Sequence, residues 1–134
     1  MKHRMGYRKL NRDSAQRKAL LRGLNTELIM HGQIVTTLEK AKELRSSIEK
    51  LVTLARQDSV ANRRLASAAL YGADAVRKLF VSVGPANATR PGGYTRLMHL
   101  GFRSGDHARR AVIEFVEPSL LIEGLASSAS KAAE

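Results

Sequence analysis

The side chains best suited to specific chemistry in this sequence are the cations of its first 23 residues. They recur at intervals of up to five positions, and the stretch carries eight basic groups against the single carboxylate of Asp13. Cations at such spacing can each meet a successive phosphate of a nucleic acid and release its counterions. A solvated tail is the alternative, but the one-sided charge favours nucleic acid. The predicted contacts here are Lys2, Arg4, Arg8, Lys9, Arg12, Arg17, Lys18 and Arg22.

A second candidate is the segment Arg90-Pro91-Gly92-Gly93-Tyr94-Thr95-Arg96. Paired glycines let backbone amides come close to a ligand, and arginines on either side supply forked donors that match phosphate. A loop that simply turns into a strand would also use glycine. The spacing alone does not separate these two interpretations.

A third candidate lies at the start of a long predicted helix, where Thr36 and Thr37 precede Lys40, Lys42 and Arg45. The helix dipole favours an anion there. Glu39 and Glu43 lie among these cations, so pairing within the helix is the favoured use of Lys42. For Arg63 and Arg64, a solvated helix face and an RNA contact stay equally open.

Catalytic and metal-binding patterns are not evident. The histidines lack ligand spacing such as i and i+4 on a helix, and the chain contains no cysteine. The carboxylates are scattered along charged helix faces, and no phosphate-binding glycine loop or nucleophile elbow occurs. We therefore expect no enzymatic activity, no cofactor and no metal.

Composition defines the class of protein and of partner. The 134 residues carry a net charge of +11 and are 43% hydrophobic, which suits one small folded domain with a polyanionic partner. No secretory signal or apolar run of membrane-spanning length is found, so we expect a soluble cytoplasmic protein without a membrane or small-molecule partner. A DNA-binding architectural protein would need a dimer face, and neither heptads nor such a face is evident, so no homo-oligomer is expected. Three Tyr, three Phe and no Trp argue against a base-stacking sheet.

The helices expected from hydrophobic periodicity number four. The first begins at the Asp13-Ser14 cap, buries Leu20, Leu24 and Leu28, and ends before Gly32. The second is the strongest, with a buried stripe of Leu38, Ala41, Leu44, Ile48, Leu51, Val52 and Ala55. The third buries Leu65, Ala66, Ala69 and Leu70, and the fourth packs Val76, Leu79, Phe80 and Val83 before Gly84-Pro85 ends it.

The expected strands are a short β-branched run at 33–37 and a hairpin formed by 94–103 and 108–117 around the turn 104–107. Together these elements predict an α+β fold, with about four helices on a small three-stranded sheet. The predicted division is an extended basic arm at 1–13, a globular RNA-binding domain at 14–117 and a weakly structured C-terminal tail at 118–134.

Several short blocks occur in one order that resembles a known family. They are Lys2-His3-Arg4, Arg8 to Arg12, Thr36-Thr37-Leu38, Lys40 to Arg45, Asn62-Arg63-Arg64, Lys78-Leu79-Phe80, Arg90 to Arg96, Gly101-Phe102-Arg103, Gly105-Asp106 and Ile113-Glu114. Over residues 1–117 the chain resembles the L-seventeen family of bacterial large-subunit ribosomal proteins. Lys2 stands where the family pattern leads us to expect arginine.

The resemblance implies a structural protein near the peptide exit that binds large-subunit (23S-type) rRNA, beside neighbouring large-subunit proteins and without cofactor or catalysis. It favours RNA contact by the arm and by the 90–96 loop. Beyond the first eight cations, the rRNA-binding residues that we then expect are His3, Asn11, Thr36, Thr37, Lys40, Arg45, Arg63, Arg64, Arg90, Gly92, Gly93, Tyr94, Arg96 and Arg103.

The C-terminal tail gives the first testable prediction. Residues 117–134 carry a net charge of −2, which phosphate would repel. Deletion of residues 118–134 should therefore leave incorporation into large subunits unchanged, as measured by the protein content of purified subunits. Loss of the truncated chain from those subunits would contradict the prediction.

Overall fold

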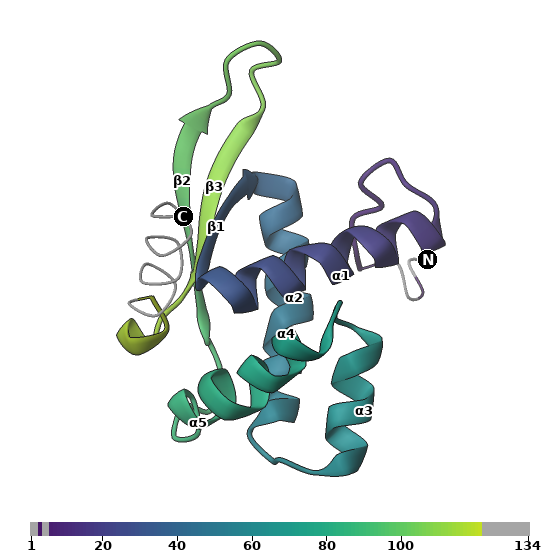
Figure 1. Cartoon of the computed structure of the whole chain (residues 1–134). Coiled ribbons are helices and arrows are strands. Elements are labelled where there is room, and N and C mark those ends of the chain that lie inside the picture. Colours follow the sequence, from purple (N-terminus) through teal and green to yellow (C-terminus); the bar gives the residue numbers. More distant parts are fainter. Residues whose placement is uncertain (1–2, 4–5, 122–134) are drawn as a thin grey trace, which may run out of the picture.

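The computed structural model describes residue 3 and residues 6–121 (Figure 1). Its helical segments are α1 (Ser14–His31), α2 (Leu38–Ala55), α3 (Val60–Ala68), α4 (Ala73–Lys78), the π-helical turn η1 (Leu79–Val83) and α5 (Gly84–Ala86). Its strands are β1 (Gln33–Thr37), β2 (Thr95–Phe102) and β3 (Arg109–Phe115), in an antiparallel sheet of order β1-β3-β2. The predicted α+β class is confirmed, including the pairing of a remote first strand with the hairpin.

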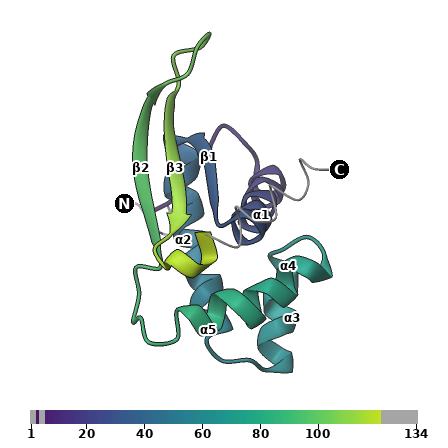
Figure 2. The same ribbon diagram turned by 60° about the vertical axis from the view of Figure 1, so that its left-hand side comes forward.

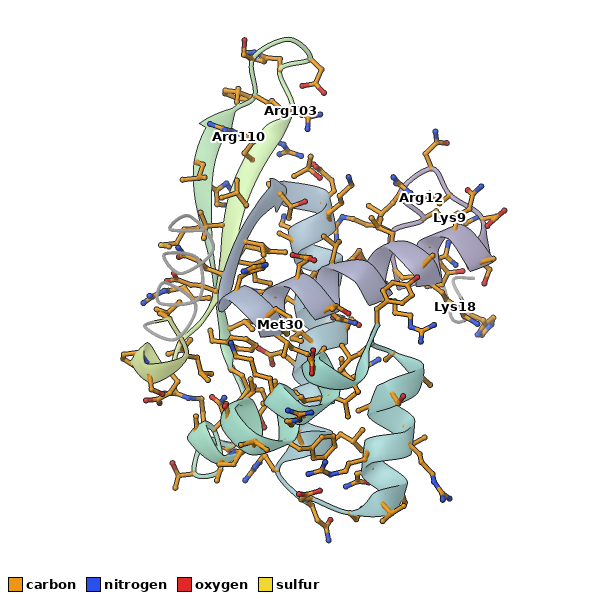
Figure 3. The ribbon with its side chains drawn as sticks, in the orientation of Figure 1. Lys9, Arg12, Lys18, Met30, Arg103 and Arg110 are labelled. Carbon is orange, nitrogen blue, oxygen red and sulfur yellow. The ribbon has the colours of Figure 1, made fainter. Side chains whose placement is uncertain are left out.

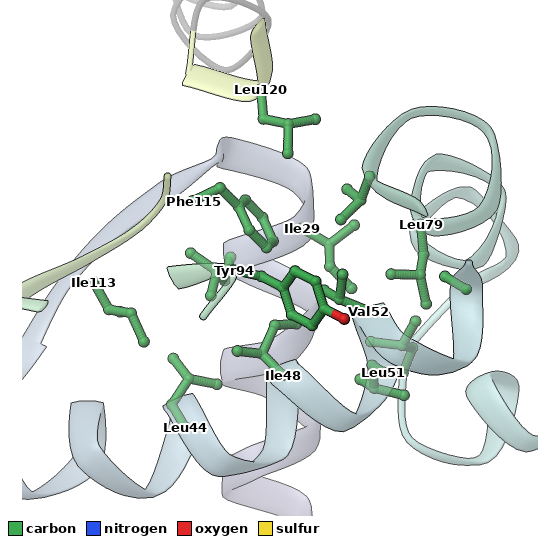
Figure 4. Close-up of a cluster of buried hydrophobic side chains, with 14 of the residues drawn as sticks. Ile29, Leu44, Ile48, Leu51, Val52, Leu79, Tyr94, Ile113, Phe115 and Leu120 are labelled. Carbon is green, nitrogen blue, oxygen red and sulfur yellow. The ribbon is translucent and has the colours of Figure 1, made fainter. Parts of the chain in front are cut away.

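Helix α2 packs across the sheet and contacts all three strands. All seven residues of its predicted stripe are buried, from Leu38 to Ala55. They meet Ala111, Ile113 and Phe115, which face the same side because strand residues alternate between the two faces. Figure 4 shows this core, in which Ile48 and Leu44 lie near Tyr94 and Ile113.

Helix α1 has the predicted ends but a different buried face. The Asp13 side chain accepts a hydrogen bond from the Gln16 amide at 2.8 Å, and Gly32 ends the helix at φ 78°, in the left-handed region that glycine favours. Its buried residues are Asn25, Leu28 and Ile29, whereas the predicted stripe residues Leu20 and Leu24 are only partly buried. The N-terminal half of α1 extends past α2 toward the arm, so less of the core covers it (Figure 1; Figure 2).

The third and fourth helices also differ in detail from the prediction. Leu65 is 61% exposed on α3, because that nine-residue helix buries only Ala66 in its interior. Gly84-Pro85 does not end the fourth helix, since α4, η1 and α5 run on to Ala86. Proline is accommodated at the junction of η1 and α5, in the first turn of α5, where its fixed φ is compatible with a helix.

The β2–β3 hairpin projects beyond the helices in both views (Figure 1; Figure 2). Ile34 of β1 pairs with Ile113, and Leu97 of β2 pairs with the same residue from the other side. The register shifts between His99 and Gly101, where Gly101 has φ 97°. This bulge lies where the hairpin leaves the body.

The start of the predicted tail is part of the body. Leu120 is 2% exposed within the core, and the Leu120 carbonyl lies 2.6 Å from where a Cβ on Gly32 would stand. Removal of residues 118–134 would therefore also remove a core residue. A tail deletion that begins after Leu121 keeps this core residue and removes only residues 122–134.

Gly84 gives a stability prediction. A Cβ there would lie 2.4 Å from the Ala55 carbonyl oxygen, so Gly84→Ala would force α5 away from the end of α2. We expect it to lower the free energy of unfolding by about 1–3 kcal/mol, the usual cost of overpacking. Gly92→Ala is the matched control, since nothing lies within 4 Å of its added Cβ. Equal midpoints in urea denaturation for the two variants would refute the close packing.

Candidate nucleic-acid interface

The first two turns of α2 connect the N-terminal arm to the hairpin. Arg8 Nη1 lies 3.3 Å from Glu43 Oε1, and Arg109 Nη2 lies 2.6 Å from Glu39 Oε1. Glu39 and Glu43 are one helical turn apart and share a face of α2. A backbone hydrogen bond at the helix start lowers the pKa of Glu39, and Arg109 and then Arg8 lower it further. Two basic segments that are separate in the sequence, the arm and the hairpin, therefore meet at α2.

A hollow of about 540 Å³ lies between α2 and the start of β2, and we call it the α2–β2 hollow. It brings together Arg45 and Gly93, which lie in separate segments of the sequence and were both predicted to bind RNA. Its other lining residues are Lys42, Ser46, Glu49 and Thr95.

The charges of the α2–β2 hollow favour an anion. Glu49 Oε1 accepts hydrogen bonds from the Thr95 amide at 3.3 Å and the Thr95 hydroxyl at 3.1 Å, so this carboxylate is engaged. Within the described part of the chain, Lys42 and Arg45 form no ion pair, and both are exposed. Lys42, for which the sequence favoured pairing within the helix, is therefore available to a ligand. Gly93 adopts φ 64°, and a Cβ there would meet nothing within 4 Å, so its backbone is open to approach.

A second hollow, of about 410 Å³, lies on the arm side of α2 and is called the arm-side hollow. Tyr7, Arg17, Glu43 and Lys50 line it, with the Arg17 guanidinium 4.6 Å from the centre of the Tyr7 ring. Ser46 lines both hollows, so the exposed ridge of α2 separates them. Lys50 was not among the predicted contacts. Acidic and basic residues recur along α2, and the sequence alone does not show which of the cations form ion pairs.

The described part of the arm folds into a turn beside α1. Leu10 and Asn11 both have φ 54°, the Arg12 amide donates to the Lys9 carbonyl at 3.1 Å, and Arg12 Nη1 donates to the Leu10 carbonyl at 2.9 Å. Lys9 and Lys18 are exposed, and Figure 3 shows Lys9 and Arg12 on this turn and Lys18 on the adjoining part of α1. His3 is exposed as well, whereas Lys2 and Arg4 lie outside the described residues.

The predicted arginines near the hairpin each have a carboxylate partner. Arg90 Nη2 lies 3.8 Å from Glu117, and Arg96 Nε donates to Glu114 at 2.8 Å. Arg103 Nε donates to Asp106 at 3.1 Å, and this hydrogen bond lowers the pKa of Asp106 well below its usual range. Arg96 and Arg103 also use Nη2, which leaves Nη1 without a partner among the described residues. These side chains can offer one donor edge to a phosphate rather than the whole fork.

Tyr94 is a correction to the predicted contacts. Its side chain is 1% exposed, and its hydroxyl lies 3.3 Å from Thr53 Oγ1 and 3.4 Å from Arg56 Nη1. A ring this deep in the core cannot stack on a base, so the Tyr94 side chain is not available for contact. Tyr94 precedes β2, in which Thr95 and Leu97 pair with the core residues Phe115 and Ile113, so alternation along the strand does not predict the burial of Tyr94.

Two of the predicted cations have structural partners. Arg22 donates to the Leu70 and Ser67 carbonyls, and Arg63 forms a two-pronged hydrogen bond with Asp58 at 2.7 and 2.8 Å. The hydrogen bond from Arg63 lowers the pKa of Asp58, so this carboxylate stays ionised and balances the charge of Arg63. Arg64, by contrast, is exposed.

The remaining predicted residues lie around the α2–β2 hollow and the start of α2. Thr36 and Thr37 are half-buried at the end of β1, Lys40 is half-buried in the first turn of α2, and Gly92 is exposed with open space around it. The sequence did not single out Arg110, which Figure 3 shows on the hairpin near Arg103. The sequence alone does not show that Arg110 lies near Arg103, because that proximity depends on the register of the hairpin.

Features of other classes of protein were not found in the part of the chain that the structure describes. Residues 3 and 6–121 contain no group of three acidic, histidine or cysteine side chains able to hold a metal ion. Among the same residues, no helix has both the length and the apolar character needed to cross a membrane.

Comparison with known families identifies the class to which these features belong. The family model described as Ribosomal protein L17 matches residues 20–116. This range includes α1 from its second turn, the whole sheet and the α2–β2 hollow. It also includes the arm-side hollow except for Tyr7 and Arg17. The family is a structural one of the large ribosomal subunit. Residues 1–19 lie outside the match, so RNA binding by the arm stays a prediction. The chain belongs to the ribosomal protein L17 family.

Proposed function

We propose that this protein binds large-subunit rRNA through a continuous basic surface centred on the exposed ridge of α2. The surface consists of the arm and the first half of α1, the two hollows beside α2, and the end of the β2–β3 hairpin. In this role the protein stabilises the folded rRNA during subunit assembly, acts in the cytoplasm as part of the ribosome, and performs no catalysis. Its partners are rRNA and neighbouring large-subunit proteins.

The observation that carries the proposal is the α2–β2 hollow. It places Lys42 and Arg45 opposite the open backbone of Gly93, with Glu49 held by Thr95. An ammonium, a guanidinium and an accessible backbone are the groups that bind phosphate oxygens in proteins. Since Lys42 and Arg45 are exposed, docking RNA requires little rearrangement there.

The distribution of ion pairs supports the same surface. Carboxylates hold Arg8, Arg109 and Arg103 in place rather than neutralising the whole patch, because Lys9, Lys18 and Lys50 form no ion pair within the described residues. Most of the +11 net charge belongs to residues 1–23, which carry eight basic groups against Asp13. Such a surface repels itself until a polyanion covers it.

The arm gives a prediction about salt dependence. If about five phosphate contacts come from Lys2, Arg4, Arg8, Lys9 and Arg12, deletion of residues 1–12 should flatten the plot of log affinity against log salt by roughly three to five units. The core should survive, because the first buried residue of α1 is Asn25. Filter binding to large-subunit rRNA over a salt series measures the slope.

Deletion of residues 122–134 is the matched control for the arm, since it removes a segment of similar length that contains one lysine and two glutamates. Circular dichroism checks that both truncated chains are folded. Equal slopes for two folded proteins would show that the arm is not the electrostatic anchor.

Arg45 gives a prediction about the α2–β2 hollow. Replacing its guanidinium with a neutral amide, Arg45→Gln, should remove one phosphate contact and lower the salt slope by roughly 0.7–0.9 units. Arg77→Gln is the control, because Arg77 is also an exposed helical arginine but lies on α4, beside Asp74 at 3.8 Å. The same loss of slope in both variants would mean that total charge, and not this hollow, determines binding.

A further inference from the structure

The tip of the β2–β3 hairpin carries two aromatic rings in contact, which we call the ring pair. The rings of Phe102 and His107 stack with their centroids 4.2 Å apart and their planes inclined by 5°. Both residues are exposed, Phe102 by 57%. The hairpin projects beyond the helices (Figure 1; Figure 2), so neither ring has a core to enter. Single exposed apolar residues are common on protein surfaces, whereas this pair forms one contiguous aromatic surface at a projecting tip.

Hydrogen bonds within the hairpin turn hold the ring pair in place. The His107 amide donates to the Arg103 carbonyl at 3.0 Å, and the Arg103 amide donates to the Ala108 carbonyl at 2.7 Å. Asp106 Oδ1 accepts from Arg103 Nε and from the Ala108 amide, each at 3.1 Å. His107 has φ 58°, in the left-handed region that histidine enters more readily than most residues. A ligand would therefore meet a preformed surface and lose less entropy on binding.

Phe102 lies on the side of the sheet that carries α2. It pairs in register with Arg109, and directly paired residues of antiparallel strands point to the same face. Arg109 is two residues before the core residue Ala111, and it reaches Glu39 in the first turn of α2 at 2.6 Å. The ring pair is therefore continuous with the basic surface that is proposed to bind rRNA.

The arginines at this end of the hairpin favour a nucleotide over an apolar protein surface. Figure 3 shows Arg103 and Arg110 there. Arg103 keeps Nη1 free, and Arg110 forms no ion pair, within the part of the chain that the structure describes. An apolar surface laid over these cations would take them out of water without compensation, which costs free energy. A nucleotide brings a phosphate for a guanidinium and a flat base for a ring.

We propose that Phe102 stacks on one unpaired base of the bound rRNA, through the surface of its ring that His107 does not cover. Stacking uses the flat face that all four bases share, so no particular base is selected. One ring pair at a hairpin tip is a smaller feature than the base-stacking sheet that the low aromatic content argues against. This inference rests on the proposed function, because the base must belong to an RNA that the protein already binds.

The first test removes the ring without changing the charge. Phe102→Leu keeps an apolar side chain, and we expect it to weaken binding to large-subunit rRNA about tenfold, as for the loss of one stacked base. The slope of log affinity against log salt should stay the same, because no phosphate contact is lost. Phe102→Tyr keeps the ring and should bind like the parent chain. Circular dichroism checks that both variants are folded, as expected for changes at an exposed position.

The second test reports contact with the base itself. The chain contains no tryptophan, so Phe102→Trp introduces a single indole at the hairpin tip. Its fluorescence should fall when rRNA binds, because indole stacks on bases and a stacked base quenches its emission. Val81→Trp is the control, since Val81 is 62% exposed on η1, outside the proposed surface. Both variants should bind like the parent chain, and the emission of Val81→Trp should not change.

The outcomes separate the two proposals. A parent chain that does not bind rRNA would overturn both of them. If the parent binds and Phe102→Leu binds equally well, the stacking site is wrong and the basic surface stands. If Phe102→Leu is then missing from purified large subunits, the ring contacts a protein instead. Weaker binding by Phe102→Leu without quenching in Phe102→Trp would mean that the ring only supports the hairpin, which also overturns the stacking site.

Discussion

The packing of α2 across the sheet is the contact on which the rest of this structure depends. Its buried stripe, from Leu38 to Ala55, covers Ala111 and Ile113 on one side and leaves a polar ridge on the other. Because a helix turns once every 3.6 residues, the same packing that buries Leu44 and Ile48 directs Lys42, Ser46 and Lys50 outward. The two hollows lie on either side of that ridge. A shift of α2 relative to the sheet would therefore alter both the core and the basic surface.

Several carboxylates of this molecule form ion pairs with arginines of the basic surface. Glu43 holds Arg8 of the arm, Glu39 holds Arg109 of the hairpin, and Asp106 holds Arg103 within the hairpin itself. Exposed ion pairs contribute little stability by themselves, and salt weakens them further. Their main effect here is geometric, since they keep the arm and the hairpin beside α2 while the unpaired lysines stay available to a polyanion. Acidic residues thus arrange the basic surface more than they reduce its charge.

Most of the fold could be predicted from periodicity, whereas side-chain partners could not. The stripe of α2 and the caps at Asp13 and Gly32 depend on local chemistry, so the sequence was sufficient to predict them. Leu65 and Leu20 were assigned to the core because periodicity cannot tell how much of a helix the rest of the protein covers. Tyr94 was predicted as a contact and is buried, and Arg22 binds the Leu70 carbonyl, which only the tertiary structure brings near. Arg63 pairs with Asp58, five residues earlier in the chain.

The order of the strands determines when this chain can acquire its structure. The middle strand, β3, is the last to leave the ribosome, and Ile34 must wait for Ile113 before β1 has any partner. Until then the apolar stripe of α2 lacks the surface that covers it, and contacts so distant in sequence form slowly. Before β3 has been made, the nascent chain is therefore cationic and exposes apolar surface at the same time. The interval before β3 pairs with β1 is the stage at which the chain is most exposed to aggregation and proteolysis.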